Sequence, residues 1–175
     1  MFGLYAALPI LAIATGRTGN PGVSKPSAHH SLRPPQSAEE WAAYHAIRRE
    51  AIFAALLPGQ HYDERDPDEF APGNLPHLLV CDGEIVGVVR IDLIDARQAG
   101  LRLIGIRADR QRRGHGSALL KLCEQAAGRF GRTDVVINAH PTSLTFYLAN
   151  GYAPGDWADK GPAHPDLIRV GKRLI

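Results

Sequence analysis

The sequence predicts a mixed α+β fold in which helices cover both faces of one central sheet. Three observations support this prediction. Two apolar runs meet at Asp82-Gly83, a dipeptide typical of tight β-hairpin turns. An apolar run at residues 101–106 leads through a glycine-containing loop into an amphipathic helix, and a β-branched run at residues 133–138 precedes a second short helix. Antiparallel strands followed by helix, strand, helix and two strands give a mixed sheet.

The composition indicates one domain with no strong charge preference. The chain has 175 residues, of which 45% are hydrophobic, enough to bury the core of a single domain. Its formal net charge of +2 is small, so composition alone indicates neither a nucleic acid nor an anionic membrane as a partner. Cys81 and Cys123 are expected to be small buried hydrophobes, one in a strand and one on a helix face. We therefore expect a reducing compartment, the cytoplasm.

Residues 1–28 are predicted to lie outside the folded domain, which is expected to span residues 29–175. Residues 2–14 are apolar and end in Ala-x-Ala, as in a secretory signal. However, no Lys or Arg precedes them, Pro9 interrupts them, and they are too short to span a membrane. An N-terminal extension is favoured over a signal peptide, and residues 15–26 are predicted to form a linker rich in Gly, Pro, Ser and Thr.

The first half of the domain is predicted to contain a short strand, a long helix and three antiparallel strands. The helix begins at Ser37, whose spacing from Glu40 is that of a capping box, and continues through Leu56 to an end at Pro58-Gly59. The strands are expected at residues 31–33, 78–81, 85–93 and 100–107.

The segment at residues 61–72 is short, interrupted by proline and acidic. Two interpretations stay open: a solvated loop or short helix face, or a surface that attracts a cationic amine. Its acidic residues are Asp63, Glu64, Asp66, Asp68 and Glu69.

The second half is predicted to contain two helices, a strand between them and two closing strands. The first helix follows Gly116, because apolar residues recur at three-and-four spacing as far as Phe130. The strand spans residues 133–138, and the second helix, residues 143–150, ends at Gly151. Closing strands are expected at residues 152–154 and 167–174, with a loop at residues 155–165.

The junction between the strand at residues 101–106 and the following helix is predicted to bind a phosphate group. The N–H groups of a helix N-terminus lack intrahelical partners and attract anions. Gly114 and Gly116 would let an anion approach closely, and Arg112 and Arg113 add guanidinium groups that match phosphate oxygens. A dinucleotide fingerprint is excluded because Leu119 stands where a third small residue is required, and no P-loop motif occurs in the sequence.

The run Gln111-x-x-Gly114-x-Gly116 directly after a strand resembles the acetyl-coenzyme A signature of the GCN5-related N-acetyltransferases, the GNAT superfamily. Downstream, a strand, a short helix containing Tyr147, a glycine and an aromatic residue resemble the late motif of the same family. The two motifs occur in family order. The resemblance implies a three-layer α/β/α acyl-CoA N-acyltransferase fold whose mixed central sheet splays apart to admit acetyl-CoA.

The resemblance also implies an enzyme, an acetyl-CoA-dependent N-acetyltransferase. It would transfer the acetyl group to a primary amine of a small molecule or protein, by direct attack in a ternary complex. Tyr147 would protonate the departing thiolate, although a purely structural role in the core is the alternative. The residues expected to bind the cosubstrate are Ile104, Gly105, Ile106, Arg112, Arg113, Gly114, His115, Gly116, Ser117 and Asn138. The side chain of His115 is expected to point away from the phosphates.

The general base is not identified by the sequence. Asp92, His140 or a water molecule could accept the proton of the amine. The histidines show no paired metal-binding spacing, so no metal site is expected.

Two further hypotheses compete with the enzyme. One is a non-catalytic acetyl-CoA-binding module of the same fold. The other is a nucleic-acid-binding protein that uses the arginines near residue 110, but these are not interleaved with aromatic residues that could stack on bases. We therefore expect an amine acceptor as partner, with no nucleic acid and no membrane. The resemblance makes a homodimer one option for the oligomeric state.

Overall fold

A seven-stranded mixed sheet forms the centre of the protein. The computed structural model describes residues 28–55, 59–157 and 167–174. The strand order is β1-β2-β3-β4-β5-β7-β6, and all neighbours pair antiparallel except β4 and β5, which are parallel. The strands are β1 (His30–Arg33), β2 (Asn74–Cys81), β3 (Glu84–Leu93), β4 (Gln98–Ile106), β5 (Asp134–Ala139), β6 (Ala153–Pro154) and β7 (Ile168–Arg173).

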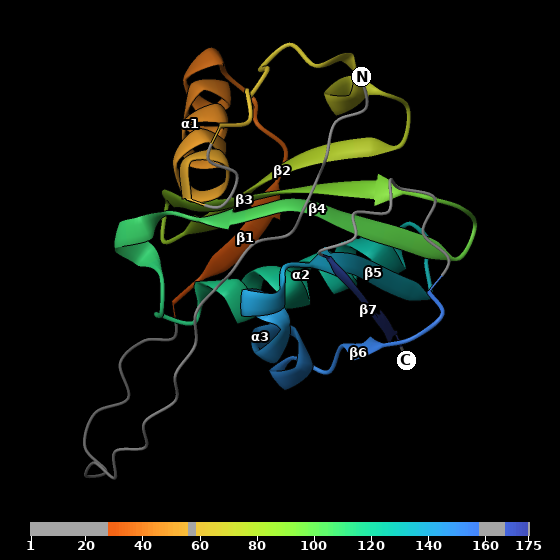
Figure 1. Cartoon of the computed structure of the whole chain (residues 1–175). Helices are drawn as coiled ribbons and strands as arrows, with labels where there is room; N and C mark the ends of the chain where they lie inside the picture. Colours follow the sequence, from red (N-terminus) through yellow and green to blue (C-terminus); the bar gives the residue numbers. More distant parts are fainter. Residues whose placement is uncertain (1–27, 56–58, 158–166, 175) are drawn as a thin grey trace, which may run out of the picture.

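Helices cover both faces of this sheet, which confirms the predicted layers (Figure 1). On one face, α1 (Ala38–Arg48) continues into the π-helical turn η1 (Arg49–Ala54). On the other face lie α2 (His115–Arg129) and α3 (Leu144–Ala149). Short 3₁₀ turns complete the structure: η2 (Pro67–Phe70), η3 (Ala108–Arg110) and η4 (Pro141–Ser143).

The start of α1 follows its sequence signal, with one difference. The Ser37 hydroxyl accepts a hydrogen bond from the Glu40 backbone N–H at 3.3 Å, as the capping box predicts. The Glu40 carboxylate does not return to Ser37. It accepts from the backbone N–H of Gln36 at 2.7 Å and pairs with Arg33 of β1, which ties the helix start to the edge strand. The predicted helix end near Leu56 and Pro58 lies outside the described residues.

The core divides along the two faces of the sheet. Alternate residues of β2 face opposite helices: Leu78 and Val80 pack under α1, whereas Leu79 and Cys81 face α2. The α2 face is the larger cluster and extends across the sheet to Val170 of β7. Each face therefore has its own apolar layer, as expected for a sheet covered on both sides.

Strand β2 is longer than predicted, because it begins at Asn74 and includes Pro76. A proline cannot donate a ladder hydrogen bond and is tolerated only where a strand lacks a neighbour on one side. Edge strand β1 covers only Leu78–Cys81 of β2, so Pro76 pairs with β3 alone. The proline therefore sits in an edge section of the strand, which the sequence did not reveal.

Of the two interpretations left open for the acidic segment, the solvated one is wrong for Glu69. This residue is 3% exposed, and its carboxylate binds Arg48 of α1 at 2.6 Å and Arg90 of β3 at 3.4 Å. The Tyr44 hydroxyl donates to the same carboxylate. Glu69 therefore fastens η2 to the helix and the sheet, while Asp68 is about half exposed on the surface.

No helix in the described ranges is both long and apolar enough to cross a bilayer.

Candidate functional site

The two parallel strands at the centre of the sheet separate toward their carboxyl ends. Their pairing joins Gln98 to Asp134, Ala99 to Val135 and Gly100 to Val136. Beyond these positions, residues 101–106 of β4 and 137–139 of β5 have no pairing with each other. Backbone groups of β4 on the side toward β5 therefore lack a neighbouring strand along this stretch. An extended polar chain could pair there as an additional strand would.

A bulge in β4 lies at the start of this separation. Leu103 has a φ of 49°, an uncommon conformation for a branched side chain, and the register with β3 shifts at the same place. As a result, Arg102 and Leu103 both turn toward the α1 side, and Ile104 returns to the α2 side. The bulge bends the strand where its backbone leaves the parallel ladder.

Ile104, Gly105 and Ile106 form the unpaired section of β4, and their side chains are already used in packing. Ile104 and Ile106 belong to the core cluster under α2. A Cβ atom on Gly105 would lie 3.3 Å from Cδ1 of Ile52, so glycine lets the π-helical turn approach the strand closely. The backbone of this section is thus held between two packed layers.

The helix N-terminus after β4 presents uncapped N–H groups at the same end of the sheet. Gly114 is the N-cap of α2 with a φ of 86°, and no side chain among the described residues caps the helix. Arg112 also has a positive φ, of 59°, so the loop turns sharply into the helix. The first helical hydrogen bond within the turn runs from Ala118 N–H to the Gly114 carbonyl, which leaves the N–H groups of residues 115–117 for an anion.

Two arginines near this turn are free to bind an anion, and two others form ion pairs with a carboxylate of the protein. Arg112 and Arg113 are exposed and form no hydrogen bond or ion pair within the described part of the chain. Arg107 and Arg110 instead bind the Glu84 carboxylate of the β2–β3 hairpin at 2.7 and 2.5 Å. The predicted anion site therefore keeps its two guanidinium groups, while the larger basic surface needed for nucleic acid is partly neutralised.

Gln111 has a role that sequence reasoning missed. Its side-chain amide donates to the backbone carbonyl of Ile106 at 3.1 Å and closes the loop between β4 and α2. The glutamine of the Gln-x-x-Gly-x-Gly run thus holds the loop in place.

Tyr147 is fully buried in α3. Its side chain is 0% exposed, and its hydroxyl forms no hydrogen bond with the described residues. Burial raises the pKa of Tyr147, so the hydroxyl keeps its proton at neutral pH. A buried hydroxyl without a partner costs roughly 1–3 kcal/mol. This orphaned donor would therefore be stabilised by an acceptor brought to it.

Ser143 carries a second buried hydroxyl group, and the sequence did not identify this residue as a candidate for the site. It precedes Tyr147 by four residues, is 0% exposed, and has an Oγ without a partner among the described residues. Positions four apart share one side of a helix. The four-residue spacing was the only sequence signal that the Ser143 and Tyr147 side chains share one side of the helix.

Asn138 lies near the end of β5 and is 6% exposed. Its side-chain carbonyl accepts from Arg169 Nε of β7 at 3.2 Å. The Asn138 side chain therefore links β5 to β7 beside the gap between β4 and β5, in addition to any contact with a ligand.

The two protein candidates for the general base are both engaged. The Asp92 carboxylate pairs with Arg90 at 2.7 Å and lies 3.6 Å from Arg102. Burial raises the pKa of Asp92, against the opposing effect of Arg90. His140 caps η4, because its Nδ1 accepts from the Thr142 N–H at 3.3 Å. Of the three candidates for the general base, water is the one that is not engaged in these hydrogen bonds and ion pairs.

The His115 side chain is directed toward β1. Its Nδ1 lies 2.8 Å from Nε2 of His30, and the ring is 8% exposed. Burial, followed by the nearby positive charges, lowers the pKa of His115. Only the backbone N–H of His115 therefore faces the predicted anion site, together with those of Gly116 and Ser117.

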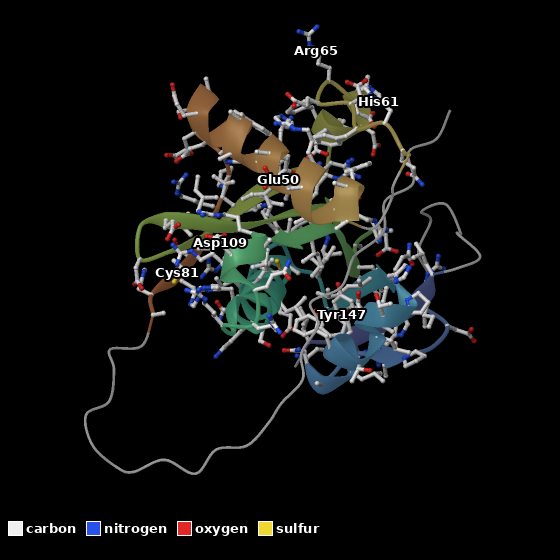
Figure 2. All side chains as sticks on the ribbon, turned by 60° about the vertical axis from the view of Figure 1, so that its left-hand side comes forward. Glu50, His61, Arg65, Cys81, Asp109 and Tyr147 are labelled. Atoms are coloured by element: carbon white, nitrogen blue, oxygen red, sulfur yellow. The ribbon has the colours of Figure 1, made fainter. Side chains whose placement is uncertain are left out.

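Two surface cavities lie elsewhere. One, of about 490 Å³, opens beside Trp157 and Asp134 at the closed end of the β4–β5 pair. The other, also about 490 Å³, lies between α1 and the β2–β3 hairpin beside Glu50. Figure 2 shows Glu50 on the π-helical turn, separated from Tyr147 by the sheet region.

The fold and this end of the sheet define a protein of the acyl-CoA N-acyltransferase class. A family model described as an acetyltransferase (GNAT) domain matches residues 45–156. The chain therefore belongs to the GNAT acetyltransferase family. The recognition made from the motifs is confirmed, as is the enzyme class, an acetyl-CoA-dependent acyltransferase. A search of curated proteins found no match.

Solved structures share the fold at low sequence identity. An acetyltransferase of the GNAT family from Staphylococcus aureus Mu50 is 12% identical with a TM-score of 0.68, over 84% of this chain and 100% of that chain. A GNAT family acetyltransferase from Elizabethkingia anophelis with acetyl-CoA bound is 17% identical with a TM-score of 0.60, over 86% and 100%. N-acetylglutamate synthase from Neisseria gonorrhoeae, complexed with coenzyme A and N-acetyl-glutamate, is 16% identical with a TM-score of 0.66, over 85% and 36%.

Proposed function

We propose that this acetyltransferase transfers the acetyl group of acetyl-CoA to a primary amine by direct attack in a ternary complex. The observation that carries the proposal is the separation of β4 and β5 beyond Gly100 and Val136, with the uncapped start of α2 at the same end. Acetyl-CoA is a polar chain with a diphosphate, and these two features suit its two parts. The similar fold of the Elizabethkingia anophelis acetyltransferase, which was solved with acetyl-CoA bound, supports the same cosubstrate.

The diphosphate is assigned to the turn from Arg112 to Ser117. Backbone N–H groups of His115, Gly116 and Ser117 would donate to phosphate oxygens, and the two arginines would add charge-assisted bonds. The amide groups of the pantetheine arm are assigned to the β5-facing backbone of Ile104, Gly105 and Ile106, with Asn138 on the opposite strand.

The transfer forms one C–N bond and breaks one C–S bond. The amine must be neutral to attack, so one proton first passes to water, since Asp92 and His140 are held by other groups. As the C–N bond forms, the nitrogen loses a second proton, which also passes to water. The sulfur leaves as a thiolate and takes a proton from the Tyr147 hydroxyl, which solvent later restores. Burial raises the pKa of Tyr147, so the hydroxyl carries its proton at neutral pH.

Initial-rate kinetics test the reaction. Release of free coenzyme A is measured while acetyl-CoA and the amine are both varied, using small primary amines, amino acids and lysine-containing peptides. Direct attack gives intersecting double-reciprocal lines. Parallel lines would indicate a covalent acetyl-enzyme and would overturn the ternary complex.

Calorimetry separates the enzyme from a non-catalytic module of the same fold. Binding of acetyl-CoA with no turnover on any acceptor class would favour the module. Absence of both binding and turnover would reject the cosubstrate site itself.

A further inference from the structure

Three potential metal-ligating side chains converge behind residues 112–117, which we call the anion-binding turn after its proposed role. His30, Cys81 and His115 each offer one ligand atom, a ring nitrogen or the sulfur, and these three atoms lie within 4.8 Å of one another. They come from three elements, β1, β2 and α2, and His30 and His115 are separated by 85 positions in the sequence. Sequence spacing could not reveal this group, and the expected absence of a metal site rested on spacing alone.

Backbone pairing between β1 and β2 fixes the relative positions of two of these ligands. His30 and Cys81 are directly opposite each other in the antiparallel β1–β2 pair, so their side chains leave the same face of the sheet. That face is covered by α2, and Cys81 belongs to its core cluster. His115 then enters from the first turn of α2. Ligands held by rigid elements need little reorganisation to bind an ion.

The donor set is that of a soft or borderline cation. One thiolate and two imidazoles are preferred ligands of Zn²⁺, with Zn–S near ~2.3 Å and Zn–N near ~2.0–2.1 Å. In a tetrahedral site these lengths put two nitrogens about 3.3 Å apart and nitrogen and sulfur about 3.6 Å apart. The two imidazole nitrogens are 2.8 Å apart. The rings would therefore separate by about half an ångström on binding, and the sulfur, which lies within 4.8 Å of a nitrogen of each ring, would settle about 3.6 Å from both. Side-chain rotation allows both adjustments.

The surroundings supply a fourth ligand and an entry path. The Asp82 carboxylate oxygen lies 3.7 Å from the Cys81 sulfur, so either Asp82 or a water could complete the site. His30 is only partly buried, whereas Cys81 and His115 are each 8% exposed.

We propose that His30, Cys81 and His115 form a structural site for Zn²⁺ that fastens the start of α2 to the β1–β2 edge of the sheet. The ion would bind the His115 side chain, while the backbone N–H of His115 faces the anion on the opposite side. Figure 2 shows Cys81 close to the start of β1 and far from Tyr147, so the site lies away from the proposed reacting atoms. The effect on acetyl-CoA binding rests on the proposed function, whereas metal binding does not.

Metal binding is tested on the full chain after chelation and removal of the chelator. Titration with Zn²⁺ is expected to give one equivalent per chain by calorimetry and by metal analysis after dialysis. Titration with Co²⁺ is expected to give a thiolate-to-metal charge-transfer band together with the visible bands of a tetrahedral ion. Less than one equivalent of Zn²⁺, or Co²⁺ spectra without the thiolate band, would overturn the site.

The variants Cys81→Ser and His30→Gln each remove one ligand without altering the anion-binding turn. Each is expected to raise the Kd for Zn²⁺ by at least ~10–100-fold, because even the loss of a residue that only orients a ligand has an effect of that size. Cys123→Ser is the matched control: it removes the other buried cysteine and should keep both the stoichiometry and the cobalt band. Unchanged Zn²⁺ affinity in Cys81→Ser or in His30→Gln contradicts the proposal.

Two measurements separate loss of Zn²⁺ binding from loss of folding, and neither depends on enzyme activity. Circular dichroism of the metal-free variants shows whether each one folds, and the cobalt spectrum of the unsubstituted chain needs no variant. The Kd for acetyl-CoA is then compared with and without Zn²⁺. Tighter binding with Zn²⁺ in the unsubstituted chain and in Cys123→Ser, but not in Cys81→Ser, supports the fastening role. One bound Zn²⁺ with an unchanged Kd for acetyl-CoA rejects that role and leaves the metal site standing.

Discussion

Gly100 of β4 and Val136 of β5 are the last residues through which these two parallel strands pair. Beyond them the strands run toward different neighbours. The β4 backbone follows the bulge at Leu103, and β5 continues to pair with β7 as far as Ala139. The carboxyl ends of the parallel strands lead to α2 and α3, so the separation is bordered by the anion-binding turn and by the helix that carries Tyr147. In the proposed function, both cosubstrate binding and acetyl transfer depend on that arrangement.

Replacing Arg112 and Arg113 with alanine is expected to weaken acetyl-CoA binding. Both side chains are exposed and without partners in the described part of the chain, so their removal leaves no buried charge behind. Each charge-assisted contact to phosphate contributes roughly tenfold or more to affinity. Calorimetry should show a higher Kd in each single variant and a larger effect in the double variant.

The control for this prediction is Arg129→Ala at the other end of α2. It removes the same charge from the same helix and should leave the Kd unchanged. If the double variant binds as tightly as the unsubstituted chain, the diphosphate lies elsewhere.

Tyr147→Phe is expected to lower kcat and leave the Kd for acetyl-CoA unchanged. The substitution removes only the hydroxyl, which has no partner among the described residues, so folding should be preserved or slightly improved. Loss of a proton donor in a transfer step typically costs about 10²–10⁴-fold in rate. Initial rates at saturating acetyl-CoA measure this loss.

Ser143→Ala is the matched comparison for Tyr147→Phe, since it also removes an unpartnered buried hydroxyl from the same stretch. Its thermal stability should change as little as that of Tyr147→Phe, while kcat is retained. Equal loss of kcat in both variants would argue against a specific role for the tyrosine proton.

Gly87→Ala is expected to destabilise the protein by about 1–3 kcal/mol through overpacking. A Cβ at this position would lie 2.6 Å from Cδ1 of Ile106 and 2.8 Å from the carbonyl oxygen of Gly105. It would therefore push against the section of β4 that is assigned to the cosubstrate. Denaturant unfolding measures the change, and the Kd for acetyl-CoA should rise with it.

Gly128→Ala gives the opposite expectation. This glycine lies in α2, and apart from its chain neighbours and the backbone of its own helix, no described atom lies within 4 Å of an added Cβ. Alanine is the better helix former, so stability should increase by roughly 0.5–1 kcal/mol. Similar effects of the two substitutions would show that the strand contacts around Gly87 are looser than these distances indicate.

Glu69→Gln is expected to destabilise the fold strongly, by about 3–5 kcal/mol, which is typical when one partner of a buried ion pair is removed. Arg48 and Arg90 are 1% and 2% exposed and would lose the carboxylate that lies between them. The free energy of unfolding from urea titration gives the value. Glu64→Gln, whose pair with Arg49 is about half exposed, should change it little.

Several local features of this protein were determined by the sequence alone. Asp82 and Gly83 both adopt positive φ, of 49° and 85°, as the tight hairpin required. Ser37 caps α1, and Gly114 starts α2 in the left-handed conformation that glycine adopts without strain. These features depend on residues within a few positions of one another, so short-range patterns are sufficient to predict them.

Contacts between distant segments were decided only by the tertiary structure. The acidity of Glu69 indicated solvent, yet two arginines from other elements hold it in the interior. His30, Cys81 and His115 showed no metal spacing, and only strand pairing and helix packing bring them together. The sequence determined the hairpin, the helix starts, the motifs and the family, because these depend on residues close together in the chain. The neighbours of each side chain across the sheet depend on strand order and register, which no local pattern contains.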